Sequence, residues 1–155
     1  GAGGRGGVRG GGVGRGAGGG LLDVRGADGF PPVGLAIFLR QPDVAKFLIE
    51  RGADVNAPAH NAQKVAPVHA AAAVRDVATM KLLLERGADP NAVQQMDVTP
   101  LHGAASRGDI EMAKLLLAHG ARPDATMTDG TSIAALAVKY NQPAFVEWFE
   151  SAVGK

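Results

Sequence analysis

Along the chain, short stretches in which apolar residues recur every three or four positions alternate with polar turns. Thr99–Gly108 is the clearest of these stretches, and its Leu101, Ala104 and Ala105 have the spacing that places them on one face of an α-helix. Threonine followed by proline favours a helix start, and glycine favours a left-handed turn at the helix end. A second amphipathic helix is predicted over Asp109–Ala118. The pattern therefore indicates a helix, a tight turn and another helix.

The two-helix pattern repeats with a period of about 33 residues. Ala66, Thr99 and Ser132 are separated by one period each, and a further copy starts near Pro31. The connection between the first two copies is slightly longer than this period requires. A pair of short helices cannot bury both of its apolar faces alone, whereas stacked pairs bury a continuous core. The repeat therefore predicts a stack of helix pairs.

Two sequence motifs stand out in the repeated units: T-P-L-H-G-A-A occupies positions 99–105, and L-L-L-E-R-G-A-D-P-N-A occupies positions 82–92. These motifs, recurring at this spacing, resemble the ankyrin repeat. The resemblance covers residues 21–155 and implies an all-α ankyrin-repeat solenoid with hairpin-like connecting loops. We expect one domain of about four helix-turn-helix units, at about 23–57, 58–92, 93–125 and 126–155.

Some units depart from the ankyrin pattern at their turns and ends. Arg75 and Asn141 stand where the turn between the helices has glycine in the third unit, and asparagine tolerates a left-handed conformation better than arginine. Glu150 falls at a position that is leucine in the preceding unit, which is typical of a closing repeat whose outer face meets water. Trp148 and Phe149 fall at core leucine positions, and we expect both to anchor the last unit.

The first 20 residues differ sharply in composition from the rest of the chain. They hold 13 of the 23 glycines, three arginines and no acid. Such a segment cannot bury enough apolar surface to offset the entropy of folding, so we expect a disordered Gly/Arg-rich tail over residues 1–20. The tail carries +3, and the remaining 13 basic and 15 acidic residues give −2. This tail has two interpretations: a flexible linker, or a segment that binds RNA through phosphate charge and arginine stacking.

No pattern indicates an enzyme, and we expect no catalytic residue, cofactor or metal. The sequence has no cysteine and none of the metalloprotease, P-loop or serine-hydrolase motifs. His69 and His102 occupy the same place in successive units, which is too far apart for a shared metal. The resemblance implies that they tie neighbouring loops together by hydrogen bonds. Asp89 and Asn91 belong to the G-A-D-x-N turn, where short polar side chains satisfy backbone groups, so a calcium site is disfavoured.

The resemblance places a binding surface on the tips of the connecting loops and on the exposed positions of the inner helices. In the family, these positions form a concave surface that binds other proteins. The matching residues here are more apolar than a solvated face requires, which marks a partner surface, unless some of them belong to the core or are covered by the tail folding back. The loop-tip candidates are Phe30, Lys64, Val65, Gln95, Met96, Val98 and Thr131, and the inner-helix candidates are Phe38, Leu39, Val74, Ser106, Arg107, Lys139 and Tyr140.

We therefore expect a non-catalytic protein–protein interaction module that serves as a scaffold or adaptor for a protein partner. The alternative is RNA or polyanion binding through the Gly/Arg-rich tail. The sequence shows no secretory signal and no apolar run long enough to cross a bilayer, so we expect a cytoplasmic monomer with no membrane partner.

Overall fold

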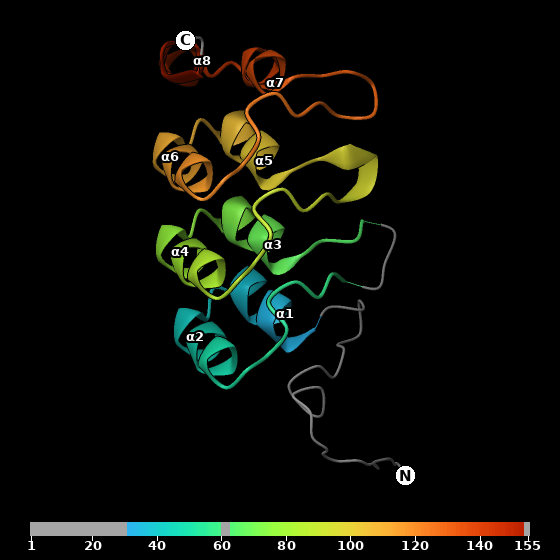
Figure 1. The fold of residues 1–155 in the computed structure, drawn as a ribbon, viewed down its shortest axis with the longest axis vertical. Coiled ribbons are helices and arrows are strands. Elements are labelled where there is room, and N and C mark those ends of the chain that lie inside the picture. Colours follow the sequence, from blue (N-terminus) through green and yellow to red (C-terminus); the bar gives the residue numbers. More distant parts are fainter. Residues whose placement is uncertain (1–30, 60–62, 154–155) are drawn as a thin grey trace.

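The computed structural model describes residues 31–59 and 63–153, which form four stacked pairs of helices (Figure 1). No strand occurs within these two ranges, and the predicted all-α solenoid is confirmed. The longest described helix has 11 residues, and none of the described helices is long and apolar enough to span a membrane. The pairs are α1 (Pro32–Phe38) with α2 (Pro42–Glu50), α3 (Pro67–Val74) with α4 (Val77–Glu85), α5 (Pro100–Arg107) with α6 (Ile110–Ala118), and α7 (Ile133–Lys139) with α8 (Pro143–Val153).

The helices form two layers (Figure 1). Helices α1, α3, α5 and α7 pack side by side in the inner layer, and α2, α4 and α6 pack in the outer layer. The long connecting loops project beside the inner layer (Figure 1). Antiparallel bridges between Gln94 and Val98 and between Thr126 and Ser132 close two of these loops, and a 3-10 turn, η2 (Gln95–Asp97), forms one tip. The expected hairpin-like connections are therefore present.

The helix ends follow the predicted capping residues. Oγ1 of Thr99 accepts a hydrogen bond from the backbone N–H of His102 at 3.3 Å, at the start of α5. Oδ1 of Asp109 accepts one from the backbone N–H of Met112 at 3.2 Å, at the start of α6. Gly108 ends α5 with a φ of 68°. Each bond satisfies one of the backbone donors that a helix start leaves unpaired.

Three residues other than glycine adopt the same left-handed conformation at the turns of the other units. Arg40, Arg75 and Asn141 have φ angles of 57°, 61° and 58°. The sequence placed Arg75 and Asn141 where the third unit has its turn glycine, without fixing a left-handed conformation for Arg75, and Arg40 adds a third case. A left-handed residue with a side chain costs about 1–2 kcal/mol, so the packing of the helix pairs must hold these turns in place.

The core lies between the two layers and continues from unit to unit. Leu101, Met112, Leu116 and Ile133 are completely buried. The alanines at 70–72 are buried as well, and their small side chains let neighbouring helices approach α3 closely. The predicted apolar stripes of the third unit therefore form core in the structure.

The aromatic residues that anchor the last unit in the core differ in part from those that the sequence predicted. Phe149 is buried as expected, whereas Trp148 is only partly buried and packs against the edge of the core. Phe145 is buried at the position that Met112 fills in the preceding unit, with its ring centroid 5.5 Å from that of Trp148 and 5.8 Å from that of Phe149. The expectation that Trp148 is a core anchor was wrong in part, because its position is at the edge of the core: its counterpart Leu115 in the preceding unit is also only partly buried.

Asparagine side chains link the turns of successive units. Nδ2 of Asn91 donates to the carbonyl oxygen of Gly120 at 3.0 Å, and its Oδ1 accepts from the backbone N–H of Arg122 at 2.7 Å. Asn56 makes the equivalent two bonds to the turn of the second unit. Oδ1 of Asp89 accepts from the backbone N–H of Asn91 at 2.8 Å, so the acid orders the turn itself. The prediction that these side chains satisfy turn backbone groups is confirmed.

Candidate partner-binding groove

A groove of about 310 Å³ lies between the inner helices and the connecting loops. All four inner helices contribute to its lining, together with the loops that precede α3, α5 and α7. We call this feature the groove, and its lining residues are Phe38, Val65, His69, Ala72, Ala73, Gln94, Val98, Thr99, Pro100, His102, Gly103, Ser106, Arg107, Met127, Leu136 and Tyr140.

The structure brings some of the predicted site residues together in the groove and leaves others out. Those in its lining are Phe38, Val65, Val98, Ser106, Arg107 and Tyr140. Those outside it are Leu39, Lys64, Val74, Gln95, Met96, Thr131 and Lys139, and Phe30 lies outside the described residues.

Burial also divides the predicted residues. Tyr140, Leu39 and Met96 are 53%, 61% and 52% exposed. Phe38, Val65 and Val74 are partly buried and pack against the core. These three side chains therefore contribute to the packing of the core as well as to the surface of the domain.

The loop tips form a continuous rim because their backbones bond to one another. The N–H of Gln95 donates to the carbonyl oxygen of Gln63 in the preceding loop at 2.8 Å. The N–H of Thr128 in the following loop donates to the carbonyl oxygen of Met96 at 3.0 Å. Met96 has a φ of 67°, and its side chain remains exposed. The rim therefore presents side chains from loops whose spacing is fixed by backbone hydrogen bonds.

Several lining residues were not among the predicted site residues. Ala72 and Gly103 are small residues on the floor of the groove, and small side chains leave space that larger ones would fill. Gln94 and Met127 lie one repeat apart, at equivalent positions of two successive loops. The signal for this second pair was present in the sequence, because Gln94 directly precedes the predicted loop-tip residue Gln95 and Met127 lies one period after Gln94.

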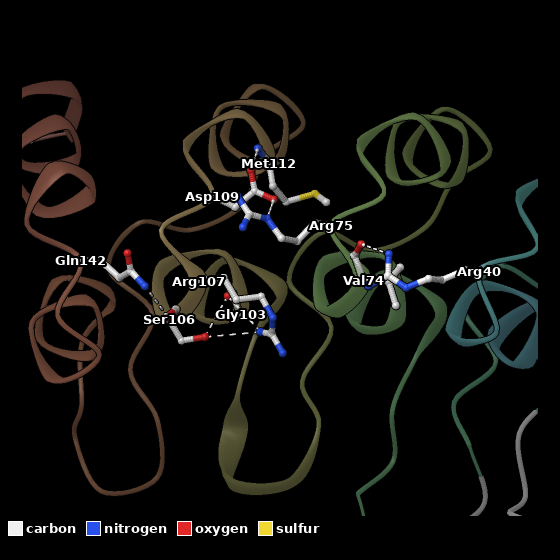
Figure 2. Close-up of polar contacts among 9 residues, drawn as sticks. All are labelled: Arg40, Val74, Arg75, Gly103, Ser106, Arg107, Asp109, Met112 and Gln142. Atoms are coloured by element: carbon white, nitrogen blue, oxygen red, sulfur yellow. Dashed lines mark hydrogen bonds and ion pairs between the residues drawn. The ribbon is translucent and has the colours of Figure 1, made fainter.

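Polar contacts organise the edge of the groove at the end of α5 (Figure 2). A guanidinium N–H of Arg107 donates to the carbonyl oxygen of Gly103 at 3.2 Å and to Oγ of Ser106 at 3.4 Å. Nε2 of Gln142, from the last unit, donates to the carbonyl oxygen of Ser106 at 3.2 Å (Figure 2). The exposed guanidinium is thereby held against α5, next to the groove.

In the two histidines that line the groove, both ring nitrogens form hydrogen bonds with the backbone. Nδ1 of His69 accepts from the backbone N–H of Ala66 at 3.1 Å, so Nε2 carries the proton and donates to the carbonyl oxygens of Ala92 and Val98 at 2.8 and 3.1 Å. His102 makes a similar but looser link one unit later: its Nδ1 accepts from the backbone N–H of Thr99 at 3.2 Å, and its Nε2 donates to the carbonyl oxygen of Thr131 at 3.4 Å. The predicted role in tying loops together is confirmed.

Burial keeps these imidazoles neutral. It lowers the pKa of His69 to about 4, although the bonds to two backbone carbonyls oppose the shift. Burial likewise lowers the pKa of His102. Since both ring nitrogens of each histidine are engaged, neither offers a free base to a bound molecule.

The charged groups around the loops do not form a metal site in the part of the chain that the structure describes. No group of three or more His, Asp or Glu residues there could hold a metal ion. The carboxylate of Asp129 accepts hydrogen bonds from the hydroxyl and the N–H of Thr131 at 2.6 and 3.0 Å, and these bonds lower its pKa. Thr131 therefore orders its own loop.

Comparison with known proteins identifies the repeated unit. A family model for ankyrin repeats, in three copies, matches residues 68–152, and a model for a single ankyrin repeat matches residues 28–60. No curated protein gave a match to the sequence. The three-copy match alone spans more than half of the chain and includes the last three helix pairs. This chain therefore belongs to the ankyrin-repeat family.

Proposed function

We propose that this ankyrin-repeat domain is a non-catalytic module that binds a protein partner in the groove. Ankyrin repeats are generally protein–protein interaction modules, and domains built from them are typically non-catalytic. The proposal for this chain adds the binding surface, the residues that form it and a scaffold or adaptor role.

The observation that carries the proposal is that one groove collects surface from all four units. Phe38, Ala73, Gly103 and Leu136 come from α1, α3, α5 and α7, respectively. A surface that crosses the whole stack is suited to a polypeptide partner, because such a partner can follow it from unit to unit. Its mixture of apolar floor and polar edge is also the composition of a protein interface.

The rigidity of the groove supports binding over catalysis. His69 and His102, which lie in its wall, hold backbone carbonyls on neighbouring loops. A preformed surface loses little conformational entropy when a partner binds, which favours affinity. The same hydrogen bonds remove the two imidazoles from acid–base chemistry.

The proposal is tested by comparing two double variants in affinity capture. Arg107→Glu/Tyr140→Ser changes one exposed charge and one exposed apolar side chain in the groove. Lys81→Glu/Val138→Ser likewise reverses one exposed charge and replaces one exposed apolar side chain by serine, but outside the groove, and Val138 is 64% exposed. We expect the groove variant to lose proteins that the wild type and the control variant both capture. Retention of every captured protein by the groove variant would argue against the proposal.

Polyanion binding through residues 1–20 is the other function that the sequence suggested, and the tail lies outside the described residues. Deletion of residues 1–20 separates the two functions. Capture through the groove survives the deletion, whereas RNA binding by the tail would be strongly salt-dependent and would disappear with it.

A further inference from the structure

The described lining of the groove carries a single charge. Among these lining residues, Arg107 alone is ionised at neutral pH. The others include no aspartate, glutamate or lysine, and His69 and His102 stay neutral because burial lowers the pKa of each. Asp97 and Asp129 belong to the connecting loops and lie outside the lining. A polypeptide in the groove therefore meets one positive charge and no negative charge in this lining.

The guanidinium of Arg107 is held in place through only one of its three nitrogens. Nη1 donates to the carbonyl oxygen of Gly103 at 3.2 Å and to Oγ of Ser106 at 3.4 Å (Figure 2). Nε and Nη2 have no partner among the described residues, and the side chain is exposed. Two neighbouring guanidinium nitrogens can bind a carboxylate through two parallel N–H···O bonds. Arg107 therefore offers an oriented and unoccupied edge that fits a carboxylate.

The same guanidinium lies beside the smallest residues on the floor of the groove. A Cβ added to Gly103 would lie 3.7 Å from Nη1 of Arg107 and 3.6 Å from Cβ of Ala72. Ala73 of α3 and Leu136 of α7 add apolar atoms to the lining on either side of α5. A polypeptide can therefore place an apolar side chain over the small floor residues while a neighbouring residue reaches the guanidinium.

We propose that the groove binds an extended peptide segment in which an internal aspartate or glutamate, next to an apolar residue, pairs with Arg107. The inference rests on the proposed function and adds the chemistry of the partner. The lining continues from α5 to α3 on one side and to α7 on the other, so a chain that follows the groove passes Arg107 with residues on both sides. An internal side chain therefore fits this position better than a terminal carboxylate.

The charge of the groove favours a carboxylate over a phosphorylated residue. A carboxylate carries one negative charge, whereas a phosphorylated side chain carries close to two at neutral pH. Arg107 supplies one positive charge, and Lys139 at the end of α7 lies outside the lining. A single guanidinium edge therefore matches a carboxylate better than a phosphate.

Selected peptides supply the probe for a test on the full chain. Peptides enriched from a displayed library of random linear sequences are synthesised with amidated C-termini, and NMR titration locates each one by the amide shifts of Ala73 and Gly103, which line the groove. We expect the groove-binding peptides to contain an acid beside an apolar residue. Replacing that acid by its amide should weaken binding at least about threefold, because the peptide then loses a charge-assisted pair.

A double-mutant cycle assigns the peptide acid to Arg107. The acid-to-amide replacement should have little effect on binding to Arg107→Gln, and it should weaken binding to Lys81→Gln as much as to the wild type. Lys81 is an exposed cation of α4 outside the groove, so it is the matched control.

The outcomes separate this inference from the proposed function. Groove-binding peptides that lack an acid, or an acid whose effect is unchanged in Arg107→Gln, would overturn the inference and leave the proposed function standing. Binding that requires a free C-terminus, or a phosphoserine in place of the acid, would overturn it in favour of that anion. Selection of no peptide, or only of peptides that leave the shifts of Ala73 and Gly103 unchanged, would contradict the proposed function and the inference together.

Discussion

Nε of Arg75 lies 3.5 Å from Oδ2 of Asp109, so an arginine in the turn of the second unit pairs with the carboxylate that caps α6 in the third (Figure 2). Oδ1 of that carboxylate accepts the backbone N–H of Met112, whereas Oδ2 has no hydrogen-bond partner among the described residues. The ion pair with Arg75 is therefore the main polar contact of the buried Oδ2 atom of Asp109. It joins two units at the position where arginine replaces the glycine of the third unit.

Substitutions of Arg75 separate the ion pair from the strain of the left-handed turn. The side chain is 58% exposed, so the pair contributes at most about 1 kcal/mol. Arg75→Gly loses the pair but relieves the turn, whereas Arg75→Ala loses the pair and keeps the φ of 61°. We expect the glycine variant to be more stable than the alanine variant by about 1 kcal/mol. Urea unfolding measures the difference, and equal stability would show that this turn carries no strain.

Two glycines of α5 and its turn should respond in opposite ways to alanine. A Cβ on Gly103 would meet Cβ of Ala72 at 3.6 Å, an ordinary contact, so Gly103→Ala should stabilise the helix by about 0.5–1 kcal/mol. A Cβ on Gly108 would collide with the side-chain amide of Gln142, and the φ of 68° at Gly108 is itself unfavourable for alanine. Gly108→Ala should therefore destabilise the domain by at least about 1 kcal/mol. Thermal and urea unfolding measure both effects. Adding Gln142→Ala removes the colliding amide and should recover part of the stability that Gly108→Ala loses. If no stability is recovered, the loss comes from the strained backbone alone.

Loss of an asparagine link should weaken the stack without disturbing the helices. Asn91→Ala removes two hydrogen bonds between the turns of the second and third units, and we expect a loss of about 1–3 kcal/mol. Asp124 lies at the equivalent position of the third unit, where its carboxylate pairs with Arg122 of its own turn at 3.7 Å. Asp124→Ala is therefore the matched control and should cost less than about 1 kcal/mol. Similar losses for both substitutions in chemical unfolding would contradict a linking role.

The buried histidines predict how stability depends on pH. The pKa of His69 falls from its ordinary 6.5 to about 4 in the folded chain, so the unfolded chain binds more protons between these two values. The stabilising contribution is therefore complete above pH 6.5 and is lost as the pH falls toward 4, by on the order of 3 kcal/mol for this group. His102 acts in the same direction.

Urea unfolding at several pH values between 4 and 7 tests this dependence. His69→Gln should reduce the slope of unfolding free energy against pH, because the titrating group is gone. His119→Gln removes an imidazole at the exposed end of α6 and serves as the control. A slope that survives His69→Gln unchanged would assign the acid sensitivity to other groups.

The sequence predicted the scaffold well because the scaffold is repeated. Thr99, Gly108 and Asp109 have local roles that follow from residue type, and each was confirmed. The partial burial of Trp148 was not predicted, because the sequence alone did not show that its counterpart Leu115 lies at the edge of the core. The stacking of four units depends on contacts between distant parts of the chain, but it could be predicted because the units recur in the sequence with a regular period.

The groove was harder to predict than the scaffold. Its floor at Ala72 and Gly103 is defined by space that side chains leave empty, and one sequence does not show empty space. Phe38 and Val65, which the sequence placed on the proposed binding surface, line the groove and also pack against the core. The ion pair between Arg75 and Asp109 was missed because the two residues belong to successive units. The sequence pattern within one unit does not show which side chains meet across the junction between units.

The affinity of a captured partner, purified and titrated against the domain by calorimetry, tests the central claim most directly. Arg107→Glu/Tyr140→Ser should weaken binding by at least about tenfold, because both side chains belong to the groove. The matched variant Lys81→Glu/Val138→Ser should bind within about twofold of the wild type, and circular dichroism should show that both variants keep the helical fold. Equal affinity of the two variants for the partner would contradict a binding site in the groove.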